Sequence, residues 1–296
     1  MPSYRQIKRR IRSVQNTAKI TNALQLVAAS KMRRAQMRAG AAKPYAERLR
    51  TVLANLAAQV GAGGEDEAVH PLLEQRTGSR VTLVVIAPNR GLSGGLPGNI
   101  NRRVLQTIRE QGPEAQIRAI AVGKKGRDFL VRGGFHVVAE YLDLGDYPSA
   151  ADVSPIVREV IDDFLDGVTD RVLLIYPDFI NTATQRPTVR QVLPVQPPES
   201  LAEREGVQID YIYEPSAKEV LAQLLPRYIE MQIYEAVLQN VASFYSAQMV
   251  AMKNATDAAN DMVDSLTLAA NKARQEQITK ELLDIVGGVA ALEGQG

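Results

Sequence analysis

Cysteine and tryptophan are absent from this 296-residue chain, and histidine occurs only at His70 and His136. Without cysteine, the chain can form no disulfide, thiolate metal site or cysteine nucleophile. The two histidines fall in a linker-like segment and in a predicted strand, which argues against a histidine metal site or catalytic dyad. Aromatic residues make up only 5% of the chain, which favours a helix-rich protein packed through small and aliphatic side chains.

Long apolar runs are also lacking. No segment approaches the roughly 20 apolar residues that a membrane-spanning helix needs. The N-terminal segment MPSYRQIKRRIRSVQNTAKI is basic but has no uninterrupted apolar core, so it is not typical of a secretory signal. We therefore expect a mature protein made in a cytoplasm-like compartment.

Charge is unevenly distributed along the chain. The first fifty positions hold 13 of the 35 basic residues but only one of the 33 acidic residues, Glu47. The N-terminal arm is therefore strongly basic and the remainder is acidic, although the net charge of the whole chain is only +2. Such an arm indicates an acidic partner, which leaves nucleic acid, anionic lipid and an acidic protein surface open.

The N-terminal segment, residues 1–60, carries a helical pattern. Its apolar residues recur in steps of three and four, which marks one narrow face of a helix. We expect a kink or a brief irregularity at Gly40 and Pro44. A turn-rich linker is predicted to follow at 61–75.

The C-terminal segment, residues 215–296, carries a similar pattern with no proline after Pro226. Periodicity sustained over such a length is typical of a coiled coil rather than of a helix buried in a globular core. We predict that the two terminal helices pair as a long antiparallel coiled coil. About ten residues of the second helix, roughly 15 Å, are expected to extend beyond the first as a nearly neutral apolar tip.

Residues 76–214 alternate between strand-like and helix-like segments, which predicts a Rossmann-like α/β domain with parallel pairing. The expected strands are 80–87, 117–122, 135–140, 171–176, 189–195 and 209–213. The expected helices are 99–111, 124–132 and 152–167. Several prolines after position 176 predict that the later strands are less regular.

The segment VVIAPNRGLSGGLPGNIN, residues 84–101, has the order of a phosphate-binding loop: strand, glycine-rich turn, helix. However, it has no Lys followed by Ser or Thr, and its glycines do not match G-x-G-x-x-G. We therefore interpret it as a tight turn with positive φ at several glycines, and we expect no bound cofactor. No arrangement of residues by spacing indicates a catalytic or metal site.

Several long motifs, in order along nearly the whole chain, closely resemble the gamma subunit of F-type ATP synthase. They are SVQNTAKITNALQLVAASKMRRAQ (13–36), NRGLSGGL (89–96), FINTATQRPT (179–188), YIYEP (211–215), VAMKNATDAANDM (250–262) and NKARQEQITKELLDIVGG (271–288). The resemblance implies a non-catalytic rotary shaft, the central stalk of the F1 sector, that couples proton-driven rotation to ATP synthesis at the beta subunits. The alternative from the residues alone is a basic coiled-coil protein that binds nucleic acid, although aromatic residues for stacking are sparse.

The resemblance also implies partners and contact residues. The partners are the ring of three alpha and three beta subunits, the epsilon subunit and the ring of c subunits, with membrane association only through the complex on the cytoplasmic face of the bacterial cell membrane. Residues that match segments facing the beta subunits are Leu24, Lys31, Arg33, Arg34, Ser93, Arg274, Gln275, Thr279 and Glu281. Residues that match the foot facing the rotor ring and the epsilon subunit are Tyr211 and Glu214.

Overall fold

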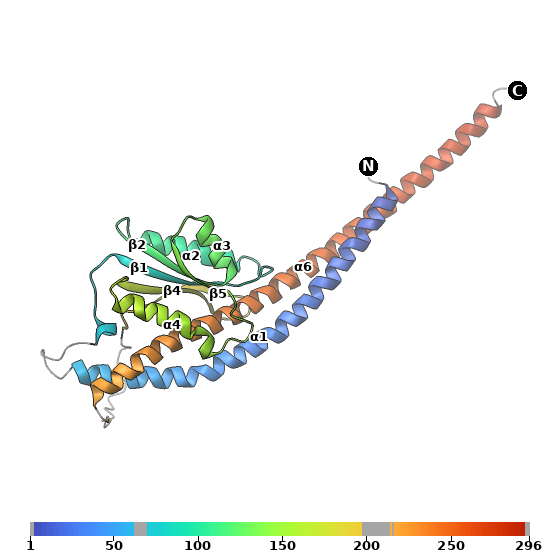
Figure 1. The fold of residues 1–296 in the computed structure, drawn as a ribbon. Helices are drawn as coiled ribbons and strands as arrows, with labels where there is room; N and C mark the ends of the chain where they lie inside the picture. Colours follow the sequence, from blue (N-terminus) through green and yellow to red (C-terminus); the bar gives the residue numbers. More distant parts are fainter. Residues whose placement is uncertain (1–2, 62–69, 197–213, 215, 294–296) are drawn as a thin grey trace. The chain divides into compact units, whose positions relative to one another are not determined.

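A very long helix lies at each end of the chain, and a sheet with its own helices lies between them in sequence (Figure 1). The computed structural model describes residues 3–61, 70–196, 214 and 216–293. The chain divides into two compact units, Met1–Ala28 with Met249–Gly296 and Ala29–Gln248. The predicted sixth strand, 209–213, and most of the predicted linker lie outside the described residues.

Helix α1 spans Tyr4–Gly61 and continues through Gly40 and Pro44, where we expected an irregularity. Proline removes one amide donor from a helix, but the helix is retained here because the turns after Pro44 are packed. Ala46, Leu49 and Leu53 are all buried in the core. Burial of this face therefore outweighs the local preference of proline to break the helix.

Helix α6 spans Ala217–Glu293 and also contains a proline, Pro226, near its start. Buried residues in its first part include Leu221, Ile229 and Val237. With Leu225, Ile233 and Ala236 they recur in steps of three and four, which forms a broad buried face directed toward the core.

The described residues form a five-stranded sheet in the order β3-β2-β1-β4-β5. The strands are β1 (Arg80–Ile86), β2 (Gln116–Val122), β3 (Val137–Tyr141), β4 (Arg171–Phe179) and β5 (Gln185–Leu193). The first four are parallel, as predicted, but β4 and β5 form an antiparallel hairpin. This hairpin corrects the expectation of parallel pairing throughout.

The hairpin has one irregularity, a register shift between Val172 and Leu173, but its pairing continues through its prolines. Pro177 and Pro187 lie opposite each other in the β4–β5 register. The ladder between β1 and β4 ends at Ile175, so Pro177 lies beyond it, and Pro187 belongs to a strand at the edge of the described sheet. Proline is tolerated where its missing amide deprives no central ladder of a donor.

Helices α2 (Leu96–Glu110), α3 (Lys124–Arg132) and α4 (Ala150–Leu165) follow the first three strands. In Figure 1, α2 and α3 lie on one side of the sheet and α4 on the other. Helix α2 starts three residues before the predicted position because Pro97 lies in its first turn. Proline is favoured there, since the first-turn amides have no partner within the helix.

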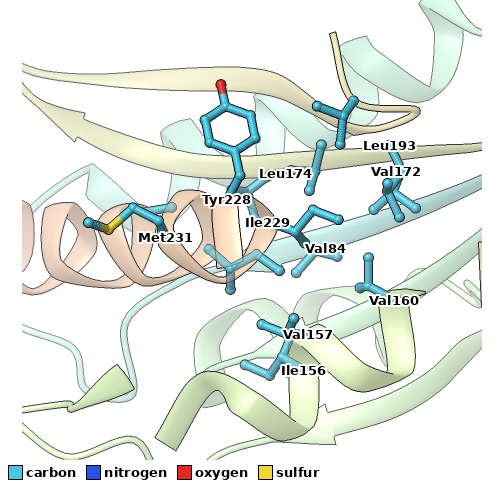
Figure 2. Close-up of a cluster of buried hydrophobic side chains, with 14 of the residues drawn as sticks. Val84, Ile156, Val157, Val160, Val172, Leu174, Leu193, Tyr228, Ile229 and Met231 are labelled. Carbon is cyan, nitrogen blue, oxygen red and sulfur yellow. The ribbon is translucent and has the colours of Figure 1, made fainter. Parts of the chain in front are cut away.

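The main core lies between the sheet and the helices α4, α1 and α6. Figure 2 shows its centre, where Ile229 of α6 meets side chains of the strands, such as Val84, and of α4, such as Ile156. All three are fully buried. Within the unit Ala29–Gln248, the sheet is therefore packed directly onto parts of both terminal helices.

Candidate functional site

The carboxyl ends of β1 and β2 form a crevice at the centre of the sheet. The strand order reverses between β1 and β4, next to this crevice, because the chain passes from β1 to β2 and β3 on one side and then returns to β4 on the other. In open α/β sheets, ligands bind at this switch point, outside the carboxyl ends of the strands. This crevice is therefore the place to test for a nucleotide or cofactor site.

The crevice is built by a close contact between two loops. Gly123, at the N-terminus of α3, has φ +100°, and a Cβ atom there would collide with the carbonyl oxygen of Ala87. Asn89 spans the neighbouring loops: its Nδ2 donates to the Leu144 carbonyl (3.2 Å), and its Oδ1 accepts from the Lys124 amide (2.9 Å). Glycine is needed at 123 for the close approach of two backbones, not for contact with a phosphate.

The glycine-rich loop after β1 differs in detail from the sequence-based expectation. Of its glycines only Gly94 has positive φ (57°), and the non-glycine residue Leu92 also has positive φ (65°). Leu92 is 62% exposed, whereas Ser93 is buried, and its hydroxyl has no hydrogen-bond partner within the described structure. The exposed apolar group of the loop is therefore Leu92, and Ser93 faces inward.

Helix α6 fills most of the crevice. Val237, Asn240, Phe244 and Tyr245 line it from the helix side, and the remaining cavity has a volume of about 60 Å³. Ligand pockets for small molecules usually have volumes of roughly 300–1,000 Å³. The crevice therefore has no room for a nucleotide, in agreement with the missing phosphate-binding motif.

Asp146, in the loop after β3, lies at the rim of this crevice between two cations. Its Oδ2 accepts a hydrogen bond from Lys31 Nζ (2.7 Å), and its Oδ1 accepts one from Arg90 (2.5 Å). Lys31 Nζ also contacts the Tyr245 hydroxyl (3.3 Å) and lies 5.3 Å from the ring centroid. We refer to Lys31, Arg90, Asp146 and Tyr245 as the Asp146 cluster.

The electrostatics of the Asp146 cluster favour its charged form. Burial alone would raise the pKa of Asp146, but hydrogen bonds with Lys31 and Tyr245 and the charge of Arg90 outweigh it, so the pKa is lowered. The hydrogen bond to Asp146 raises the pKa of Lys31 despite partial burial. Burial, together with the hydrogen bond to Asp146, raises the pKa of Tyr245 to about 12. Near neutral pH the cluster therefore holds a charged Lys–Asp pair and a neutral tyrosine.

The remaining basic residues of this part of α1 are more exposed than Lys31. Arg34 donates to the Tyr147 hydroxyl (3.1 Å), and the Arg38 guanidinium lies 4.5 Å from the centroid of the same ring. Arg33 is exposed. The predicted contact residues Lys31, Arg33 and Arg34 thus differ: Lys31 is engaged within the chain, whereas the two arginines lie on the surface.

In the other compact unit, Thr21 of α1 and Thr256 of α6 form a hydrogen bond between their hydroxyls (2.6 Å). The predicted contact residue Leu24 is half-buried nearby in sequence. The predicted contact residues of α6 are exposed: Arg274, Gln275, Thr279 and Glu281. Among the foot residues, Glu214 is exposed, and Tyr211 lies outside the described residues.

Helix α6 has no buried face in its last part. Every residue from Arg274 to Gly287 is exposed, including the apolar Leu283, Ile285 and Val286. A continuous helix with apolar residues exposed on several sides indicates a segment that meets other molecules.

Sequence reasoning missed Asp146 and Tyr245. Asp146 lies in a polar loop segment, DLGDYPS, and Tyr245 lies within a long helical pattern, so neither carries a motif. Within the described part of the chain, no three acidic or histidine side chains are grouped in a way that would hold a metal ion. No helix in that part has an apolar stretch suited to crossing a bilayer.

Comparison with known proteins identifies the family. A family model described as ATP synthase matches residues 3–292. The chain is 49% identical over 292 residues to the ATP synthase gamma chain of Dehalococcoides mccartyi strain CBDB1, covering 99% of this chain and 100% of that protein.

Two solved structures share the fold. One is the central stalk and c-ring of the Tetrahymena thermophila mitochondrial ATP synthase: TM-score 0.59, identity 23%, with 80% of this chain and 99% of that chain covered. The other is the rotor of the Euglena gracilis mitochondrial ATP synthase: TM-score 0.64, identity 17%, with 93% and 98% covered. No comparison supports the alternative of a nucleic-acid-binding protein. The chain belongs to the ATP synthase gamma chain family.

Proposed function

We propose that this chain is the central shaft of an F1Fo ATP synthase. It couples rotation of a proton-driven rotor to conformational cycling, and hence to ATP synthesis, at the beta subunits, and it makes and breaks no bond itself. The observation that carries this proposal is the 49% identity to a gamma chain over the whole length of both proteins. A crevice of about 60 Å³ at the switch point of the sheet agrees with a mechanical rather than a catalytic role.

The two terminal helices are proposed to pair as an antiparallel coiled coil. Support comes from the Thr21–Thr256 hydrogen bond and from buried positions seven residues apart, such as Thr21 and Ala28 in α1 and Met252 and Ala259 in α6. A seven-residue repeat keeps one seam of each helix facing its partner. Small residues at three of these positions, Thr21, Ala28 and Ala259, allow close approach of the two helices, which suits a stiff rod.

The shaft is proposed to lie inside a ring of three alpha and three beta subunits, with the epsilon subunit and the c-ring at its foot. The similar solved structures are a central stalk with its c-ring and a rotor. This assembly would hold the chain at the cytoplasmic face of the bacterial cell membrane. Glu214, and with it Tyr211, is proposed to face the rotor ring and the epsilon subunit.

Contacts with the beta subunits are proposed for the exposed members of the predicted set. In the basic arm these are Arg33 and Arg34; Leu24, which lies earlier in α1 and is half-buried, is proposed as a further contact. In α6 they are Arg274, Gln275, Thr279 and Glu281, in the part of the helix that is exposed on all sides. Lys31 and Ser93 are not proposed to contact the beta subunits directly, since Lys31 is bound to Asp146 and Ser93 is buried. Residues next to them in sequence form the proposed surface instead.

Co-expression with alpha and beta subunits of a related bacterium tests the proposal. We expect a purified complex with one copy of this chain for three alpha and three beta subunits, and ATPase activity that depends on the chain. Calorimetry with ATP on the isolated chain should give no binding heat. A chain that never co-purifies with alpha and beta, or that binds nucleic acid tightly at near-physiological salt instead, would contradict the proposal.

A further inference from the structure

The crevice at the switch point is filled by the chain itself rather than left open to a ligand. The sheet has the topology in which such a crevice usually receives a ligand. Here, side chains of the protein's own helix α6, among them Val237 and Phe244, occupy it. The place where a related fold would hold a nucleotide thus holds part of a terminal helix.

Apolar contacts keep α6 in the crevice, and close packing holds its buried side chains in place. The hydrophobic effect itself is non-directional, so it adds no preferred angle. Hydrogen bonds lose strength steeply with angle, and charged ones are about twice as strong as neutral ones. Directional polar contacts at the rim of the crevice therefore add resistance to twisting beyond that of the packed core.

The Asp146 cluster supplies such contacts. Asp146 comes from the loop after β3, Lys31 from α1 and Tyr245 from α6, and Lys31 Nζ joins the carboxylate to the tyrosine hydroxyl. Arg90, from the loop after β1, holds the other carboxylate oxygen. The Lys31 and Asp146 side chains are only 28% and 22% exposed, which limits screening by solvent and salt.

We propose that Asp146 is a positioning residue that locks α1 and α6 to the sheet, so that torque on the α/β domain reaches both helices without slip. The inference rests on the proposed function as a rotary shaft. It assigns Lys31 to an internal contact rather than to the beta subunits. Arg33, which is exposed two positions further on, then remains free to meet a partner.

A double-mutant cycle in the assembled complex tests this lock. The variants are Lys31→Gln, Asp146→Asn and the pair together. Each single variant should lower proton pumping per ATP hydrolysed, and the double variant should be no worse than Asp146→Asn alone, because that change already removes the contact with Lys31. If Lys31 instead acted on a beta subunit, the two effects would add, and the inference would be wrong.

Hydrogen exchange gives a second readout that does not depend on coupling. Exchange of the Gly123 and Lys125 amides, which donate to the Tyr141 and Pro88 carbonyls (both 3.0 Å) where the loops carrying Asp146 and Arg90 begin, should be about tenfold faster in Asp146→Asn. This factor corresponds to loss of one charge-assisted hydrogen bond worth about 1.4 kcal/mol. Unchanged exchange would overturn the lock. If Asp146→Asn does not assemble, Lys31→Gln alone still tests the lock. In that variant, exchange must become faster at the same amides, which are far from Lys31 in sequence.

A matched control is Glu140→Gln, which breaks the Arg127–Glu140 ion pair within the α/β domain (3.1 Å). That pair is similarly exposed but contacts neither terminal helix through its charges, so coupling should stay at the wild-type level.

The wild-type complex separates the two proposals. If it does not assemble or couple, the proposed function fails. If it couples well and the Lys31 and Asp146 variants couple equally well, only the lock fails.

Discussion

Replacement of Ile229 by alanine should strongly destabilise the unit that contains the sheet. Ile229 lies on α6 and is fully buried between the sheet and α4 (Figure 2). The change removes three carbon atoms from the core. At about 0.8 kcal/mol for each buried methylene, the lost transfer free energy is roughly 2.5 kcal/mol.

A cavity term adds to this loss. If the surroundings did not relax, a void on the order of 80 Å³ would cost about 2 kcal/mol more. Because neighbours such as Val84 and Ile156 come from a strand and a helix held by other contacts, little relaxation is expected. The free energy of unfolding should therefore fall by about 2.5–4.5 kcal/mol.

Urea unfolding of the chain, followed by circular dichroism, measures this difference. The matched control is Ile285→Ala on the same helix, where the side chain is 64% exposed; its effect should stay within about 0.5 kcal/mol. The slope of free energy against urea should be unchanged for both variants. A loss below about 1 kcal/mol at Ile229 would refute its place in a tightly packed core between shaft and sheet.

Two further predictions concern the backbone and pH. Gly123→Ala should destabilise the chain by more than about 3 kcal/mol, because the φ of this residue is positive and a Cβ atom would collide with the Ala87 carbonyl. As the control, Gly98→Ala has open space around it and should change thermal stability little or raise it. Hydrogen bonds from Arg80 lower the pKa of Asp170 in the folded chain. Ionised Asp170 therefore contributes to the free energy of unfolding above the pKa of the unfolded state, and this contribution is lost as the pH falls below about 4. Asp170→Asn should therefore flatten the acid side of the stability profile, and an unchanged acid limb would contradict this assignment.

The repetitive parts of the fold could be predicted from the sequence. Strands predicted at 80–87 and 117–122 are observed at Arg80–Ile86 and Gln116–Val122, and helix α3 has the predicted ends. These elements are short, strongly patterned and bounded by glycine or polar residues. In such segments, local preference and burial agree, so periodicity alone locates them.

Features set by contacts between distant segments could not be predicted. Strand β5 was expected to begin at 189 but begins at Gln185, because the hairpin tolerates Pro187 opposite Pro177. Helix α1 continues through Pro44 because its later turns are buried. In each case tertiary packing outweighs the local preference of proline to interrupt a helix or strand, and only that local preference can be read from the sequence.

The candidate site was predictable only in part. The family motifs point to the basic arm and to the end of α6, but whether a residue is free or engaged depends on its partners in space. Lys31 and Asp146 are 115 positions apart, and no periodicity links them. Ser93 lies in a glycine-rich loop that reads as a surface turn, yet its side chain is buried because Leu92 adopts positive φ and takes the outward position.

Single-molecule rotation tests the central claim most directly. Since the chain has no cysteine, Val131→Cys in α3, an exposed position, gives one unique site for a bead. In a complex whose alpha and beta subunits are fixed to a surface, ATP should drive stepwise rotation of the bead in one direction. A complex that hydrolyses ATP at the normal rate while the labelled chain stays still would contradict the account.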